Sequence, residues 1–203
     1  MPHAVEFEVV APSGRPGESA ILSAALHVLG AKGYNGMSMR DVATNAGTSL
    51  SNLYNYFPSK VDLVATLLTI TNNDLLARLE AAVALAPTDA SSRLRAAIGA
   101  YAEFNVEKTT ASVIGISEIR YIAGEQRKAV IAARDRTEGL FKQIVRDGVR
   151  AGEFSTPHAD AAARGLVTML SAMSLWYRPG GPLDARELAA QQIELGMALV
   201  QAG

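Results

Sequence analysis

Cysteine is absent from this chain of 203 residues, which excludes disulfides, thiolate nucleophiles and thiolate metal sites. Histidine is scarce, and His3, His27 and His158 lie far apart in the sequence. Neither H-E-x-x-H nor G-x-S-x-G occurs, and the glycines at 14 and 17 lack the lysine of a phosphate-binding loop. We therefore predict that the protein is not an enzyme and uses no metal or cofactor.

Long apolar runs and a targeting pattern are also missing. No apolar run approaches the ~18–20 residues that span a membrane, and residues 1–17 lack the basic start and apolar core of a signal peptide. With the absence of cysteine, this fits a cytoplasmic protein without a membrane partner. Proline and glycine recur between residues 1 and 17, so we predict a flexible tail there.

Charge is sparse, whereas apolar residues are plentiful. Charged residues make up 19% of the chain, apolar residues make up 49%, and the net charge is −1. Alanine and leucine are abundant, and the alternation typical of strands is scarce. The composition predicts an all-α protein with a core large enough for a small head and a larger domain.

Residues 37–60, MSMRDVATNAGTSLSNLYNYFPSK, predict two short helices joined by a glycine turn. Ser38 and Asp41 have the spacing of a capping box. Gly47 suits the left-handed residue that ends a helix, and Thr48 or Ser49 can cap the next one. This is the arrangement of a helix-turn-helix, in which the second helix enters the major groove of DNA.

The second helix has one apolar face and one polar face. Leu50, Leu53, Tyr54 and Phe57 have helical spacing, and Pro58 ends the helix. Leu53 and Phe57, with Val42 from the first helix, are predicted core residues. No acidic residue lies between positions 44 and 61, which favours a surface that meets bases and phosphates. The alternative is a polar surface helix in an unrelated helical protein.

Residues 19–64 resemble the N-terminal domain of the TetR family of transcriptional regulators. The pattern comprises AKGY at 31–34, MSMRDVA at 37–43, AGTS at 46–49, LYNYF at 53–57 and Ser59-Lys60. The motif covers about a quarter of the chain, and the remainder matches only in length and helical character. The resemblance implies a ligand-responsive regulator, most often a repressor, that binds a palindromic operator as a dimer.

The resemblance also implies roles for single positions. The expected DNA-binding residues are Arg40, Thr48, Ser49, Ser51, Asn52, Tyr54, Asn55, Tyr56 and Lys60. Ser51, Asn52 and Asn55 are the candidates for base contact. The candidates for phosphate contact are Arg40, Tyr54, Tyr56 and Lys60. Thr48 and Ser49 open the recognition helix, where hydroxyls and backbone amides reach DNA. Asn55 stands where the family commonly has an aromatic residue, and Tyr56 stands where it commonly has a histidine. Both departures bear on the operator sequence.

Charge gives the DNA-binding hypothesis little support. Residues 1–60 contain four basic and four acidic residues, whereas a DNA-binding domain is often strongly basic. We therefore expect modest non-specific affinity and a shallow dependence on salt.

Further helices are predicted over 59–85, 89–108, 125–151, 157–177 and 184–201, with one or two short helices in 109–123. We predict three regions: the tail over 1–17, the DNA-binding domain over 18–64, and a helical effector-binding and dimerisation domain over 65–203.

Two apolar stripes on the last two helices are interpreted as a dimer interface, as the resemblance implies. Its candidate residues are Leu166, Leu170, Leu188, Gln192, Leu195 and Leu199. Large apolar and aromatic side chains on several helices are candidates for an effector site, with an arginine for an anionic group. They are Tyr101, Phe104, Tyr121, Phe141, Met169, Met173, Trp176 and Arg178.

Residues 176–183, WYRPGGPL, resemble a turn of TetR-like regulators of fatty-acid, aromatic-acid and steroid catabolism, several of which sense acyl-CoA thioesters. The predicted effector is therefore a small apolar or acyl-CoA-type molecule. It would shift the dimer towards a state that does not fit the operator. The alternatives from other functional classes are a helical protein-binding adaptor and a small helical enzyme.

Overall fold

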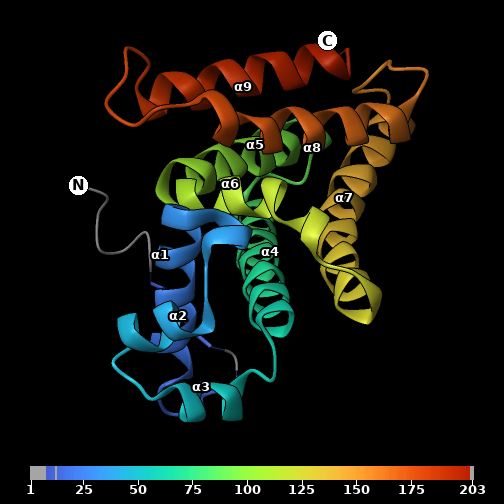
Figure 1. The fold of residues 1–203 in the computed structure, drawn as a ribbon. Helices are drawn as coiled ribbons and strands as arrows, with labels where there is room; N and C mark the ends of the chain where they lie inside the picture. Colours follow the sequence, from blue (N-terminus) through green and yellow to red (C-terminus); the bar gives the residue numbers. More distant parts are fainter. Residues whose placement is uncertain (1–7, 12, 202–203) are drawn as a thin grey trace. The chain divides into compact units, whose positions relative to one another are not determined.

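The computed structural model describes residues 8–11 and 13–201, so Pro2, His3 and Pro12 of the predicted tail lie outside the described residues. The described part is helical, which confirms the all-α prediction (Figure 1). The helices are α1 Glu18–Gly36, α2 Met39–Asn45, α3 Leu50–Tyr56, α4 Lys60–Leu85, α5 Ala90–Glu107, α6 Thr109–Ser117, the short 3₁₀ helix η2 Ile119–Tyr121, α7 Gly124–Ala151, α8 Ala159–Trp176 and α9 Ala185–Leu199.

Local capping explains why the short helices begin where they do. The Ser38 hydroxyl accepts the backbone N–H of Asp41 at 3.1 Å, and the Asp41 carboxylate accepts the N–H of Ser38 at 3.1 Å. Ser49 caps α3 by accepting the N–H of Asn52 at 3.1 Å. Both caps agree with the sequence-based prediction, and each satisfies backbone donors that a helix start leaves without a partner.

The chain forms two compact units. Residues 1–72 and 108–133 make up unit 1, and residues 73–107 and 134–203 make up unit 2. Both α4 and α7 run from one unit into the other along the chain. The predicted domain boundary at residue 64 remains a prediction; the compact units differ from it because residues 108–133 pack with the head.

The core of unit 1 joins the helix-turn-helix to residues distant in the sequence. Val42 and Leu53 have no exposed surface and Phe57 is buried, as predicted. These side chains share one cluster with Ile114 of α6 and Val130 of α7. Since α2 and α3 have seven residues each, this shared core supplies the stability that such short helices lack alone.

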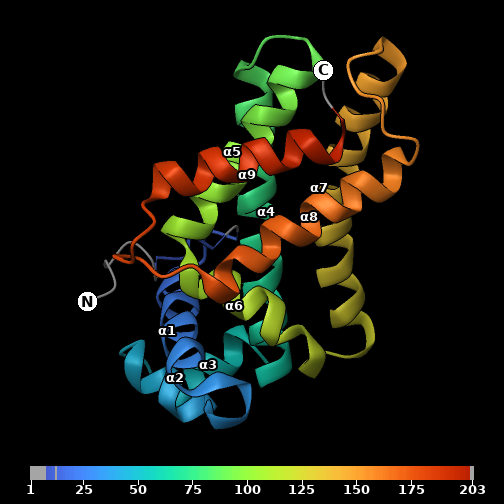
Figure 2. The ribbon, with the colours of Figure 1, turned by 90° about the horizontal axis from the view of Figure 1, so that it is seen from above.

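In unit 2, α5 packs against both α8 and α9, and α9 crosses α5 in the view of Figure 2. Glu153 follows α7 and caps α5: its carboxylate accepts the backbone N–H groups of Ala90 at 3.0 Å and Ser91 at 2.8 Å. These two bonds lower the pKa of Glu153.

No helix in the described ranges is long and apolar enough to cross a lipid bilayer.

Candidate nucleic-acid interface

The turn between α2 and α3 has the geometry that the sequence predicts. Gly47 adopts a φ of 64°, in the region that glycine enters most readily. The backbone N–H of Gly47 donates to the backbone carbonyl of Thr44 at 3.2 Å, and that of Thr48 donates to the backbone carbonyl of Ala43 at 3.0 Å. These bonds hold the start of α3 against the end of α2, so the two helices form one motif.

The outer face of α3 carries short polar groups. Ser51, Asn52, Tyr54 and Asn55 are exposed. The Asn52 amide donates to the Thr48 hydroxyl at 2.8 Å, which fixes the amide over the start of the helix. Amides and hydroxyls can both donate to and accept from base edges, and α3 carries no carboxylate that would repel phosphate. The face is therefore chemically suited to the major groove.

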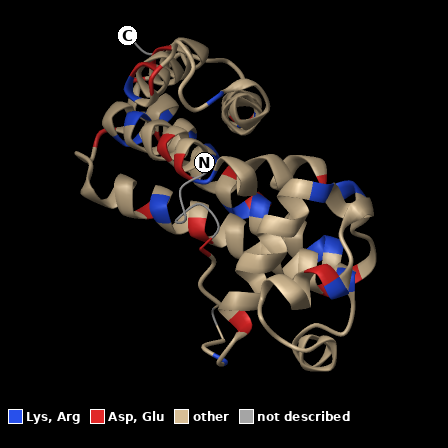
Figure 3. Ribbon diagram, turned by 60° about the vertical axis from the view of Figure 1, so that its left-hand side comes forward, with Lys and Arg blue, Asp and Glu red and all other residues tan. Residues whose placement is uncertain are grey.

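Most basic side chains of the DNA-binding head interact with other groups of the head. Lys32 forms an ion pair with Asp41 at 3.0 Å, and Arg15 forms one with Glu18 at 3.1 Å. The Ser38 hydroxyl and then Lys32 lower the pKa of Asp41, so its carboxylate stays charged. Figure 3 shows basic and acidic positions interspersed along the helices rather than gathered by sign.

Lys60, a candidate phosphate contact, is directed into the head. Its ammonium donates to the carbonyl of Met37 at 2.6 Å and lies 4.3 Å from the ring centroid of Tyr34. Partial burial lowers the pKa of Lys60. Among the lysines and arginines of the described segments between positions 8 and 60, Arg40 alone has an exposed side chain that makes no hydrogen bond, ion pair or ring contact. It is the cation most available to a phosphate.

Tyr54 and Tyr56 differ in their surroundings, although both were predicted to face phosphate. Tyr54 is exposed, whereas Tyr56 is half-buried and its hydroxyl donates to the carbonyl of Pro16. Whether either ring meets DNA stays a prediction.

A contact between the head and residues 117–121 was not predicted from the sequence. Glu118 is buried, and its carboxylate accepts the backbone N–H of Tyr34 at 3.1 Å. The rings of Tyr34 and Tyr121 stack at 4.9 Å with an angle of 6°. The local signal was Gly33, whose φ of 65° interrupts α1 one residue before Tyr34. No local pattern identifies the carboxylate 84 residues away that accepts it.

The eight predicted effector residues do not form one group. Tyr121 belongs to unit 1, and the other seven belong to unit 2. Tyr101, Phe104, Phe141 and Met173 are buried, while Trp176 and Arg178 are exposed.

The rings of Tyr101 and Phe141 lie 6.4 Å apart, and the Tyr101 hydroxyl lies 2.9 Å from that of Ser171. Burial raises the pKa of Tyr101, so the phenol stays protonated. The guanidinium of Arg178 donates to the backbone carbonyl of Tyr177 at 3.0 Å.

The predicted dimer residues differ in exposure within the single chain. Leu166, Leu170 and Leu188 have no exposed surface and belong to the core cluster of unit 2, and Gln192 is buried. Helical spacing alone does not distinguish a core stripe from an interface stripe, so the dimer interface stays a prediction.

Leu195 and Leu199 of the predicted interface are exposed, 54% and 42% respectively. Leu175 and Trp176, near the end of α8, are also large exposed apolar residues. Large apolar side chains left in water favour burial against a partner.

The chain matches two family models. Residues 87–200 match the tetracyclin repressor-like C-terminal domain, and residues 21–67 match the bacterial regulatory proteins of the tetR family. The chain belongs to the TetR family. Membership confirms the resemblance and the prediction of a transcriptional regulator rather than an enzyme.

Two TetR-family relatives are similar over most of the chain. The HTH-type transcriptional repressor KstR2 of Mycobacterium tuberculosis is 27% identical over 185 residues, which cover 90% of this chain and 91% of the relative. The HTH-type transcriptional activator FasR of Mycolicibacterium smegmatis is 30% identical over 168 residues, which cover 81% and 74% respectively.

Solved structures share the fold. A regulatory protein of the family from Rhodococcus RHA1 aligns with a TM-score of 0.86 and 25% identity, over 93% of this chain and 98% of that chain. The structure of AibR in complex with isovaleryl coenzyme A and operator DNA aligns with a TM-score of 0.82 and 18% identity, over 92% and 100%.

The distribution of charge predicts which residue sets the salt dependence of DNA binding. Replacing Arg40 with Gln should reduce the slope of log K against log salt concentration by about 0.9 for each bound chain, because the variant neutralises one phosphate fewer. Fluorescence anisotropy with a random-sequence duplex at several KCl concentrations measures this slope. Lys32→Gln is the control and should change the slope less, because Asp41 already engages that lysine. Equal slopes for wild type and Arg40→Gln would contradict the assignment.

Proposed function

We propose that this TetR-family regulator is a cytoplasmic repressor that binds a palindromic operator as a homodimer and is released by a small apolar or acyl-CoA-type effector. The observation that carries the DNA-binding part is the exposed, carboxylate-free face of α3 in a capped helix-turn-helix. Repression is supported by the similarity to KstR2, which is named a repressor. The adaptor and enzyme alternatives are not favoured.

Base recognition in this proposal rests on Ser51, Asn52 and Asn55. Their side chains are exposed on one short helix, and an amide can form two hydrogen bonds with adenine in the major groove. Phosphate contacts come from Arg40, from the hydroxyls of Thr48 and Ser49, and from Tyr54. Lys60 joins them only if its ammonium exchanges the Met37 carbonyl for a phosphate oxygen.

Dimerisation in this proposal uses the exposed apolar residues of α8 and α9 instead of the buried stripe. Leu195 and Leu199 are one turn apart on α9, so they share a face. A single short recognition helix reads few bases, and helix-turn-helix proteins therefore commonly bind two half-sites as dimers.

The effector in this proposal contacts the buried aromatic residues of unit 2. Tyr101 and Phe141 supply apolar surface, and the hydroxyls of Tyr101 and Ser171 supply polar groups. An acyl-CoA thioester is supported by the turn at residues 176–183 and by AibR, whose structure contains isovaleryl coenzyme A and operator DNA.

Effector and DNA are coupled in this proposal through α4, which starts at Lys60 in unit 1 and ends at Leu85 in unit 2. A ligand can shift the protein away from its DNA-bound state only as far as it binds the other state more tightly.

The DNA-binding part predicts a weaker sequence preference when the two asparagines are replaced. The wild type should prefer a duplex from its own upstream region to a scrambled duplex. Asn52→Ala with Asn55→Ala should weaken that preference by about 1–3 kcal/mol for each base that is no longer read. Fluorescence anisotropy measures both affinities, and circular dichroism verifies the fold.

Asn45→Ala is the control, since this α2 side chain donates to the carbonyl of Asp41 and lies outside the proposed contact set. An undiminished preference in the double variant would refute the base contacts. A wild type that does not distinguish the upstream duplex, or any duplex selected from a random pool, from scrambled DNA would refute the proposed function.

The dimer part predicts that charge on the exposed α9 face prevents association. Leu195→Glu with Leu199→Glu should yield a monomer, because burying two carboxylates in an apolar interface is costly. Light scattering after size-exclusion chromatography gives the mass. Leu85→Glu, at an 89% exposed leucine, should remain a dimer. A dimeric double variant would place the interface elsewhere.

The effector part predicts unequal ligand affinities in the two states. Isovaleryl-CoA should bind the free protein at least tenfold more tightly than the DNA complex, and should release the duplex to that extent. Calorimetric titration with and without DNA measures both constants, with free coenzyme A as the control ligand. Equal constants would exclude the acyl-CoA as an effector.

A further inference from the structure

The segment before α1 is attached to the head at several points. The side chains of Val9 and Ala11 are buried in the core cluster of unit 1. The backbone N–H of Val9 donates to the Ser23 hydroxyl at 3.0 Å, and that of Ala11 donates to the Ser19 hydroxyl at 2.9 Å. Residues 9–11 therefore run along α1 with apolar and polar contacts.

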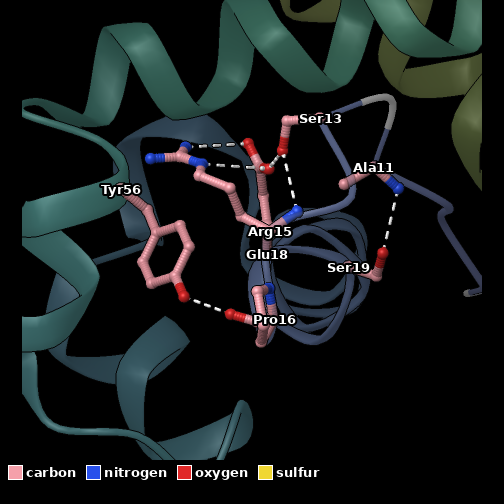
Figure 4. A network of polar contacts seen from close by, with 7 residues as sticks. All are labelled: Ala11, Ser13, Arg15, Pro16, Glu18, Ser19 and Tyr56. Atoms are coloured by element: carbon pink, nitrogen blue, oxygen red, sulfur yellow. Dashed lines mark hydrogen bonds and ion pairs between the residues drawn. The ribbon is translucent and has the colours of Figure 1, made fainter.

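Arg15 attaches residues 13–17 of this segment to the start of α1 (Figure 4). Its guanidinium donates to the two carboxylate oxygens of Glu18 at 3.1 and 3.4 Å, and the hydroxyl of Ser13 donates to the same carboxylate. Glu18 is only 5% exposed, so this carboxylate is held in place by its partners. The charge of Arg15 is thereby neutralised within the head.

Tyr56, the last residue of the recognition helix, joins this segment to α3. Its hydroxyl donates to the carbonyl of Pro16, and the guanidinium carbon of Arg15 lies 4.6 Å from the centre of its ring (Figure 4). Gly17 has a φ of 84°, which turns the chain into α1 immediately after Pro16. A cation over a ring and a hydrogen bond thus act on one side chain.

The recognition helix is short and has few fully buried side chains. Of its seven residues Leu53 alone is buried, Phe57 follows as a second buried residue, and Leu50 and Tyr56 are partly buried against the same core. The backbone bonds of the glycine turn hold the start of the helix against α2. The hydrogen bond between Tyr56 and Pro16 adds a contact at the other end of the helix.

We propose that residues 9–11 and 13–17 form a brace that sets the orientation of the recognition helix, with Tyr56 as the positioning residue that connects the two. The brace rests on the proposed function in that it makes operator preference depend on residues that touch no base. It also assigns the Tyr56 hydroxyl to Pro16 rather than to a phosphate.

Hydrogen exchange tests the brace without DNA. In Tyr56→Phe, amides of the peptide covering residues 8–17 should exchange about threefold to tenfold faster than in the wild type, which corresponds to the removal of one hydrogen bond. Tyr54→Phe removes the same group from the same helix and should leave this peptide unchanged. Unchanged exchange in Tyr56→Phe would overturn the brace.

DNA binding then tests the effect on orientation. Ser19→Ala loosens the brace at α1, outside the helix-turn-helix, and should reduce the ratio of affinities for preferred and random duplexes about threefold to tenfold. Ser112→Ala, at a buried hydroxyl without a hydrogen-bond partner, is the matched control and should keep the ratio. An unchanged ratio in Ser19→Ala, including one in which the affinities for both duplexes fall equally, would overturn the positioning role. If the wild type has no preferred duplex, the proposed function fails, while hydrogen exchange still decides whether the brace exists.

Discussion

The burial of Leu53 is the interaction on which the DNA-binding head depends. A helix of seven residues is not stable by itself, and the polar face of α3 contributes nothing to a core. Leu53 and Phe57 attach it to a cluster that includes residues of α1, α2, α4, α6 and α7. The same attachment keeps Ser51, Asn52 and Asn55 on the outside, so the packing of α3 and the exposure of its polar face depend on the same contacts.

The head neutralises most of its own positive charge. Arg15 and Lys32 pair with carboxylates, and Lys60 is bound to a carbonyl and a ring. Non-specific affinity for DNA comes mainly from basic residues. In the proposed complex, a head with one uncommitted arginine among its described residues would rely on short-range hydrogen bonds, which distinguish sequences better than charge does.

Local features of the structure were predicted well from the sequence, and long-range features were not. The caps at Ser38 and Ser49 and the left-handed Gly47 follow from residues three or four positions apart, so the pattern determines them. The contact of Glu118 with Tyr34 joins residues 84 positions apart, and no local pattern encodes it. The stripes that contain Leu166 on α8 and Leu188 on α9 have the spacing of any buried helix face, and only the packing of α5 against α8 and α9 shows that these leucines are covered within the chain. The proline- and glycine-rich start suggested flexibility, yet buried Val9 and the ion pair of Arg15 attach it to α1.

Dimethyl sulfate interference on a preferred duplex tests most directly whether α3 reads the major groove. The reagent methylates N7 of guanine in the major groove and N3 of adenine in the minor groove. We predict that guanine methylation blocks binding at two clusters about one helical turn, or a multiple of it, apart. On a preferred duplex whose half-sites contain guanine, interference confined to adenine N3 would contradict recognition through α3.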